Sequence, residues 1–184
     1  MPDVVDVIKQ DHREVERLFE VLRSEPDERP GTLPVLVTLL TAHSRAEEAE
    51  VYPAARDEAG AEGEVEHSQQ EHAEADELLQ RLADTDPSSA EFGSTLEELV
   101  TAVTHHVEEE ESTVLPAMTT GLTGQRRREL ADAFLSSRAN HLGDVPADIT
   151  KAERQVQAQN AGISGASSMT KDEIGEELVK EFEE

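Results

Sequence analysis

One short frame occurs twice in this sequence, and the repeat limits the folds that the chain can adopt more than any other feature. HSRAEEAEVYP at residues 43–53 reappears as HVEEEESTVLP at residues 106–116, each with a His, a Glu four residues later and a Pro ten residues after the His. A second pair, DHREVERLFEVL at 11–22 and EHAEADELLQRL at 71–82, is offset by nearly the same distance along the chain. Two matching segments in the same order indicate a duplicated helical hairpin.

The apolar periodicity predicts an all-α protein, an up-and-down four-helix bundle with short connections. Because 36% of the residues are hydrophobic and only 3% are aromatic, the core must consist mostly of Leu, Val and Ala. The four long helices are expected at residues 3–24, about 32–53, about 62–83 and about 89–116.

The ends of these elements follow from turn residues. Thr32 is a candidate cap for the second helix, which can continue past a kink at Pro53 as far as Gly60. A short fifth helix is expected in TGQRRRELADAFLSSR. We therefore expect a bundle domain at residues 1–142, followed at 143–184 by a linker and a small helical tail.

The composition excludes several classes of function. A net charge of −26 disfavours nucleic acid and anionic lipid as direct partners and attracts cations. The chain contains no Cys, so any bound metal must be held by nitrogen and oxygen atoms. No apolar run approaches the length of a membrane span, and the N-terminus MPDVVDVIKQDH has no signal-peptide pattern, so we expect a cytoplasmic protein with no membrane partner.

Each predicted long helix places one His on its core-facing stripe. In the second helix Leu36 and Leu40 lie on one face, and the same steps of three and four residues lead to His43 and then Glu47. The corresponding steps in the other helices lead to His12, His72, His106 and Glu110.

These six side chains predict a metal site. A single core His is more often satisfied by local hydrogen bonds, but four converging imidazoles and two carboxylates without a Lys or Arg on the same stripes would be costly to bury. Two divalent cations would supply the missing charge. The predicted metal ligands are His12, His43, Glu47, His72, His106 and Glu110.

The remaining candidates are interpreted as non-ligands. His105 also precedes a Glu by four residues, but the repeat aligns His106, not His105, with His43. His67 lies about 100° off its stripe, and His141 is expected at the surface beyond the fifth helix. The run Glu108, Glu109 and Glu111 is interpreted as a solvated face, with Glu48 and Glu111 as outside candidates for an additional carboxylate ligand.

The order H…HxxxE…H…HxxxE over about residues 3–142 resembles the hemerythrin-like family of HHE cation-binding domains, and the doubled HxxxEE-x4-P frame makes the resemblance specific. The resemblance implies a non-haem di-iron centre, two Fe ions bridged by an oxo or hydroxo group, inside a four-helix bundle. Carried over by motif, it implies terminal imidazoles at His12, His43, His72 and His106, and bridging carboxylates at Glu47 and Glu110.

One position departs from the oxygen carriers of that family. They have a second His one turn before the third-helix ligand, where this chain has Ser68. One imidazole fewer leaves an additional exchangeable iron position, which favours reaction with the bound molecule over simple carriage. Water, Glu48, Glu111 or Tyr52 could fill that position, although Tyr52 is more simply interpreted as a packed aromatic with its hydroxyl at the edge.

Two related metal sites are excluded. A ferritin-type site needs two Glu-x-x-His pairs, and only Glu64 to His67 fits, off the core stripe. A hydrolytic zinc site of the HExxH kind is absent.

The tail sequence NAGISGASSMTKDEIGEELVKEF loosely resembles the small helix–extended–helix units of the Rho N-terminal region and of SAP-type modules. Those relatives often bind nucleic acid, but this tail is acidic, so no direct nucleic acid binding is expected. It is either a flexible or lightly docked appendage or a contact site for another protein.

The chain is predicted to be a di-iron protein that binds and reacts with a small oxidant, namely hydrogen peroxide, dioxygen or nitric oxide. Such a protein would act in oxygen binding or in oxidative stress. The alternative is an iron- or oxygen-sensing or iron-binding module without turnover. The sequence leaves open whether the chain is an enzyme, with catalase-like or other di-iron redox activity.

Overall fold

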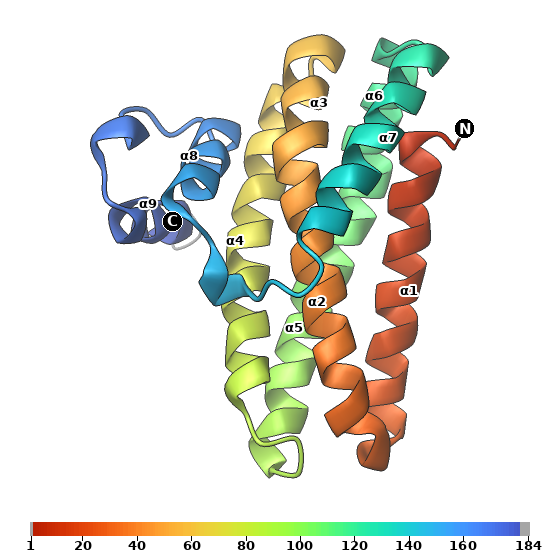
Figure 1. Ribbon diagram of the computed structural model, residues 1–184, viewed down its shortest axis with the longest axis vertical. Coiled ribbons are helices and arrows are strands. Elements are labelled where there is room, and N and C mark those ends of the chain that lie inside the picture. The colour runs from red at the N-terminus through yellow and green to blue at the C-terminus, as the bar shows by residue number, and fades with distance from the viewer. Residues whose placement is uncertain (1, 181–184) are drawn as a thin grey trace.

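The computed structural model describes residues 2–180, and within that range it contains helices and no strand. The all-α bundle expected from the sequence is confirmed, with four long helices that run along the long axis of the molecule (Figure 1). These helices are α1 (Val4–Ser24), α2 (Arg29–Ala46), α4 (Glu62–Asp84) and α5 (Ala90–Ser112). None of the helices in the described part of the chain has both the length and the apolar character to cross a bilayer.

Side-chain caps fix the starts of α1 and α5. The Asp3 carboxylate accepts a hydrogen bond from the Val5 N–H at 3.1 Å, and the Ser89 hydroxyl accepts one from the Phe92 N–H at 3.2 Å. Each cap satisfies a backbone donor that the first helical turn leaves without a partner. These starts agree with the helix ends expected from the sequence.

The start of α2 differs from the prediction. A 3₁₀ turn, η1 (Pro26–Glu28), leads directly into the helix at Arg29, so Thr32 is not its cap. Pro30 lies in the first turn, where a missing N–H costs nothing, and Pro34 is accommodated further along the same helix. The chain therefore starts this helix one turn earlier than expected.

Neither copy of the repeated frame ends its helix at the Pro. After Ala46 the chain forms a π-helical turn, η2 (Glu47–Val51), and continues as α3 (Tyr52–Ala59) to Gly60, whose φ of 71° closes the helix. In the second copy, a short break at Thr113 separates α5 from α6 (Val114–Gly121). The π turn is one residue wider than an α turn, and such turns are frequent at functional sites.

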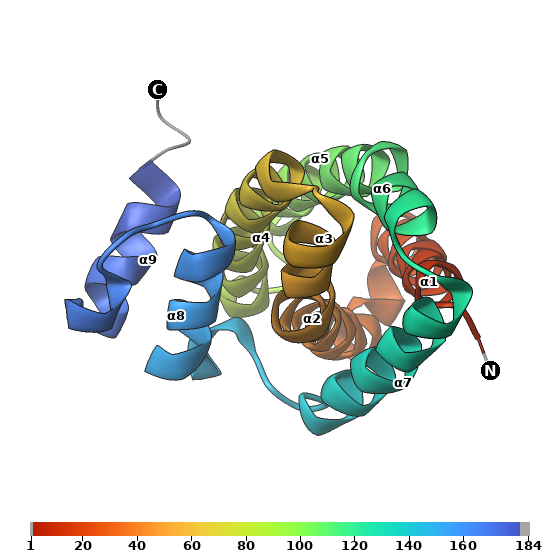
Figure 2. The same cartoon turned by 90° about the horizontal axis from the view of Figure 1, so that it is seen from above.

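The remaining helices lie outside the four-helix core. The fifth helix of the prediction is α7 (Gly124–Asn140), which lies against α1 and α2 (Figure 2). The tail forms α8 (Lys151–Asn160) and α9 (Lys171–Lys180), which lie beside α4 on another side of the bundle (Figure 2). Two 3₁₀ turns, η3 (Pro146–Asp148) and η4 (Ala166–Ser168), precede and separate them; residues 181–184 of the predicted tail lie outside the described residues.

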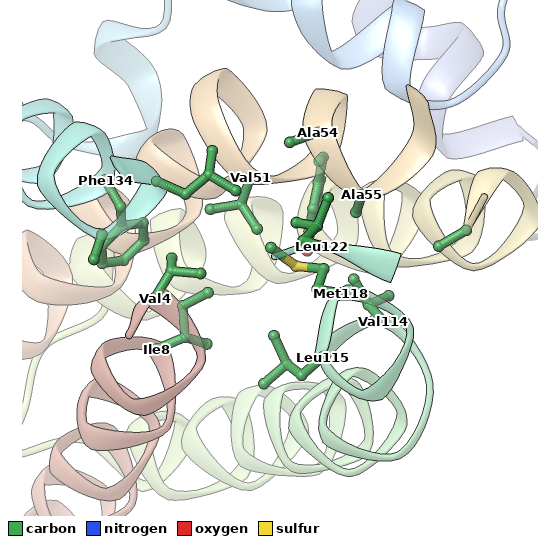
Figure 3. Packing of buried hydrophobic residues seen from close by; sticks show 14 of the residues in the cluster. Val4, Ile8, Val51, Ala54, Ala55, Val114, Leu115, Met118, Leu122 and Phe134 are labelled. Atoms are coloured by element: carbon green, nitrogen blue, oxygen red, sulfur yellow. The ribbon is translucent and has the colours of Figure 1, made fainter. Parts of the chain in front are cut away.

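Two apolar clusters fill the bundle, one above the other along its axis in the orientation of Figure 1. The upper cluster contains Val4, Ile8, Val51, Tyr52, Leu115, Met118 and Phe134 among others, and Figure 3 shows its side chains converging from α1, α3, α6 and α7. The lower cluster contains Val15, Leu22, Leu36, Leu40, Leu79, Leu99 and Val103 among others. His12 lies between Ile8 of the upper cluster and Val15 of the lower one, and the other three predicted ligand histidines are interposed in the same way.

Candidate metal centre

The polar layer between the two apolar clusters contains the six side chains that the sequence singles out. Each of the four long helices contributes one His, η2 contributes Glu47 and α5 contributes Glu110. His106, the most accessible of the six, is only 6% exposed, and both Glu side chains are fully buried. The apolar stripes that were used to predict the register therefore bring all six into the same interior layer.

Glu47 lies between two pairs of imidazoles. Its Oε2 is 3.1 Å from His43 Nε2 and 3.5 Å from His72 Nε2. His12, His43 and Glu47 form one group whose candidate ligand atoms lie within 4.8 Å of one another, and Glu47, His72 and His106 form another. Glu110 Oε2 is 3.3 Å from His12 Nε2. The layer thus contains two adjacent groups that share the carboxylate of Glu47, an arrangement that could hold two metal ions side by side.

Most of the inward-facing atoms of this layer lack hydrogen-bond partners. His12 Nε2, His43 Nε2 and both carboxylate oxygens of Glu47 and Glu110 are buried without one. Leaving a buried polar group unpaired costs about 1–3 kcal/mol, and more when it is charged. Metal ions would satisfy all of these atoms at once, so the donor set fits divalent cations with nitrogen and oxygen ligands.

A carboxylate faces the outer nitrogen of every imidazole. Two of these acids directly precede a ligand candidate: Asp11 lies 3.2 Å from His43 Nδ1, and Glu71 lies 2.9 Å from His106 Nδ1. Two others directly follow a candidate: Glu48 lies 3.2 Å from His72 Nδ1, and Glu111 lies 2.9 Å from His12 Nδ1. Such pairs fix the tautomer and orient Nε2 toward a metal. The repeat therefore supplies four orienting acids as well as six inward donors.

The charges in this layer favour cations at its centre. Burial lowers the pKa of His43, but Glu47 and Asp11 outweigh burial and raise it to about 10. Burial also opposes a charge on His72, yet Glu47 and Glu48 hold its pKa well above the ordinary value. Burial raises the pKa of Glu47, whereas His43 and His72 lower it, and it stays well below the ordinary value. Protons or metal ions can supply the positive charge that these carboxylates attract.

Tyr52 lies in the centre and not at its edge, contrary to the simpler interpretation of the sequence. The side chain is fully buried, and its hydroxyl is 3.0 Å from His72 Nε2. Burial and the charge of Glu110 raise the pKa of the phenol well above its ordinary value, so it keeps its proton. His72 Nε2 is also 3.1 Å from His106 Nε2. Ser68, in place of a fifth imidazole, is buried one turn before His72 on α4.

Glu48 and Glu111 have a different position from the one that the sequence suggested. Glu111 is not part of a solvated face, because its side chain is only 23% exposed and contacts both His12 and Arg13. Both acids face Nδ1, the outer nitrogen, and so orient imidazoles from outside the ring of inward donors. Sequence reasoning missed the same role for Asp11 and Glu71, although both immediately precede a stripe His at matching places in the repeat.

The other histidines lie outside the inner layer. His67 and His105 are exposed on α4 and α5. Each lies near both Glu71 and Glu109, one acid on its own helix and the other on the neighbouring helix. His141 is partly buried, and its Nδ1 lies 2.9 Å from Asp144. It is therefore paired within the linker and is not a free surface residue.

The tail contacts this centre through two buried amides. Gln157 Nε2 donates hydrogen bonds to both carboxylate oxygens of Glu48, at 2.9 and 3.0 Å. Asn160 donates to Gln69 Oε1 at 2.9 Å and to the backbone carbonyl of Glu48 at 3.0 Å. Gln69 in turn donates to Glu48 at 2.8 Å. Helix α8 is therefore docked on the acid that orients His72.

Comparisons with known proteins show the family of this chain. The family model described as the hemerythrin HHE cation binding domain matches residues 3–118. The chain belongs to the hemerythrin-like family. An uncharacterised hemerythrin-like protein of Schizosaccharomyces pombe (strain 972 / ATCC 24843) is 28% identical over 138 residues, which are 73% of this chain and 68% of that protein.

A protein of Nostoc sp. (strain PCC 7120 / SAG 25.82 / UTEX 2576) named DNA nickase is 31% identical over 139 residues. The match covers 74% of this chain but only 39% of the nickase, so this hemerythrin-like chain spans about two fifths of that relative's length. No solved structure gives a significant match. The family and the His/Glu groups together identify a hemerythrin-like cation-binding domain.

Proposed function

We propose that this hemerythrin-like domain holds two iron ions in its polar layer and reacts there with a small oxidant: hydrogen peroxide, dioxygen or nitric oxide. His12 and His43 would hold one ion, His72 and His106 would hold the other, and Glu47 would bridge the two. Glu110 would be the second bridging carboxylate. The observation that carries the proposal is the convergence of these buried donors, most of whose inner atoms are unpaired.

The ions would supply redox chemistry that the side chains lack. The protein's contribution is to orient four imidazoles through their outer acids and to keep bulk water out with an apolar cluster on either side. Ser68 leaves the second ion with one imidazole fewer, which favours a position open to a small molecule. Tyr52 holds a proton on its hydroxyl oxygen next to His72, where it can donate a hydrogen bond to a molecule at that position.

The first test is metal content after anaerobic loading with ferrous iron. The unmodified protein should hold two irons per chain, and His106→Ala should lose at least one of them. His105→Ala is the matched control, because it removes the neighbouring exposed imidazole and should keep both. Far-UV circular dichroism would verify that the variants are folded. Equal iron contents in all three proteins would contradict the ligand assignment.

The second test concerns reactivity. Peroxide consumption by the loaded protein, with release of one dioxygen for every two peroxides, would identify a catalase-like activity. A stable, reversible dioxygen complex without turnover would identify a carrier instead. Tyr52→Phe should keep both irons but change the rate of peroxide consumption, because only the hydroxyl is removed.

A sensing module is the second candidate, and the contact of Gln157 with Glu48 favours it. Iron at His72 would then be coupled to docking of the tail. Protease sensitivity of residues 143–180 that changes with iron loading would support sensing, and sensitivity independent of iron would count against it.

The similarity to a DNA nickase does not support DNA cleavage by this chain. It covers less than half of that protein, and a net charge of −26 repels a phosphate backbone. The expected partner remains a small oxidant.

A further inference from the structure

A second group of imidazoles and carboxylates lies on the surface where α4 and α5 pack side by side. His67 and Glu71 are one turn apart on α4, and His105 and Glu109 are one turn apart on α5. One candidate ligand atom from each of the four lies within 4.8 Å of the other three. Both histidines are exposed, whereas Glu71 is buried.

The distances within this group fit a single metal ion. His67 Nε2 lies 3.0 Å from Glu109 Oε2 and 3.6 Å from Glu71 Oε1. His105 Nε2 lies 3.5 Å from Glu109 Oε1 and 3.6 Å from Glu71 Oε1. Ligand atoms around a tetrahedral zinc ion, with bonds of about 2.0–2.1 Å, are about 3.3–3.4 Å apart. Small rotations of two exposed imidazoles would therefore be enough to complete the site.

Glu71 provides an independent indication of a ligand. The residue is 5% exposed, and its Oε2 is paired with His106 Nδ1 at 2.9 Å. Its Oε1 is buried without a hydrogen-bond partner and faces His67 and His105. A buried, unpaired carboxylate oxygen is costly, and native structures rarely contain one without a ligand or water.

We propose that His67, Glu71, His105 and Glu109 form a mononuclear site for a divalent cation of the zinc type, separate from the inner centre. Two imidazole nitrogens and two carboxylate oxygens are a donor set that zinc accepts, and the acidic surface favours cations. Glu71 belongs to both sites, because one oxygen faces the outer ion and the other orients His106. The alternative is a group of ordinary surface ion pairs, which would contribute little and bind no metal.

The test counts zinc bound to the full chain. Metal-stripped protein is equilibrated with buffered Zn²⁺, and bound zinc is measured by atomic emission. The double variant His67→Ala/His105→Ala should bind one ion fewer than the unmodified protein. This difference of one ion is expected whether or not zinc also enters the inner centre, so the result does not depend on the proposed iron chemistry.

A matched pair of acids on α5 provides the control. Glu109→Gln should weaken binding of the outer ion at least tenfold, whereas Glu108→Gln, which removes an equal charge from the exposed face next to it, should leave binding unchanged. Cobalt gives a second readout, because the double variant should lose the intense visible absorption of one tetrahedral Co²⁺.

Three results would overturn the proposal. The double variant could bind as much zinc as the unmodified protein. Glu108→Gln could weaken binding as much as Glu109→Gln, which would indicate general attraction to an acidic surface. The double variant could lose more than one ion, which would mean that His67 and His105 support the inner centre and form no separate site.

Discussion

Replacing Gln157 with alanine tests whether the tail is coupled to the metal centre. The side chain is fully buried, and one amide group donates to both oxygens of Glu48, at 2.9 and 3.0 Å. Hydrogen bonds to charged groups contribute about 1.5–3 kcal/mol, so the loss of this amide should weaken docking of α8 by about 2 kcal/mol. That corresponds to about a 30-fold shift of the docking equilibrium.

Hydrogen exchange of the iron-loaded protein measures this shift directly. Amides of residues 151–160 should exchange about 30-fold faster in Gln157→Ala, while those of α1 should be unchanged. Glu48 keeps its bond from Gln69, so iron should still bind, but its release to a chelator should be about tenfold faster because His72 is held less firmly.

The neighbouring Gln159 is exposed on the same helix, which makes Gln159→Ala the matched control. If both variants exchange at the same rate, Gln157 does not hold the tail on the bundle. If Gln157→Ala frees the tail but iron release is unchanged, docking is real but its link to His72 through Glu48 is refuted.

Four further predictions concern the proposed metal ligands and the buried charges. Glu110→Ala should halve or abolish iron binding in the inner centre, whereas Glu109→Ala should leave the inner iron count at two; metal analysis distinguishes them. Because imidazoles bind metal only when neutral, iron retention against a chelator should fall as the pH falls from 8 to 5. The unfolding free energy of metal-stripped protein should instead rise as the pH falls. His43, whose pKa is raised to about 10, contributes stability that is fully present below pH 6.5 and is lost as the pH rises through 10. Burial raises the pKa of Asp76 from 3.8 to about 7, so the wild-type fold loses stability as the pH rises through that window. Asp76→Asn should therefore be more stable in urea by up to about 4 kcal/mol at pH 8 and by little at pH 4.

The helical register was predictable because it depends on local periodicity. Steps of three and four residues place His43 and Glu47 on the same stripe as Leu36 and Leu40, and the fold buries all of them. The end of that helix was not predictable in the same way. Pro53 was expected to end or kink it, but the chain passes through a π turn, which depends on the packing of the buried residues around it.

The orienting acids were harder to predict because they act between helices. Glu48 lies next to Glu47 in sequence, yet it reaches an imidazole on α4, and no spacing within one helix reveals that contact. The same holds for Tyr52, whose hydroxyl meets His72 across the bundle. The available signal was the repeat itself, since acids at matching places in both copies indicate a shared role.

The pattern of these pairs explains why two hairpins are needed. Within each hairpin the acid before the first His orients the second: Asp11 contacts His43, and Glu71 contacts His106. The acid after Glu47 instead crosses to the other hairpin, so Glu48 orients His72. Neither hairpin alone can orient both of its imidazoles, and duplication therefore builds one centre from two interdependent halves.

The tail gives the two equivalent acids Glu48 and Glu111 different surroundings. Glu111, which orients His12, is partly exposed and is paired with Arg13, a full positive charge. Glu48, its counterpart in the first copy, is buried under α8, where the neutral amide of Gln157 covers both of its oxygens. A carboxylate neutralised by arginine donates less charge to its imidazole than one held by an amide. His72 is therefore a more electron-rich imidazole than His12, and it lies next to Tyr52, whose hydroxyl keeps its proton 3.0 Å from His72 Nε2.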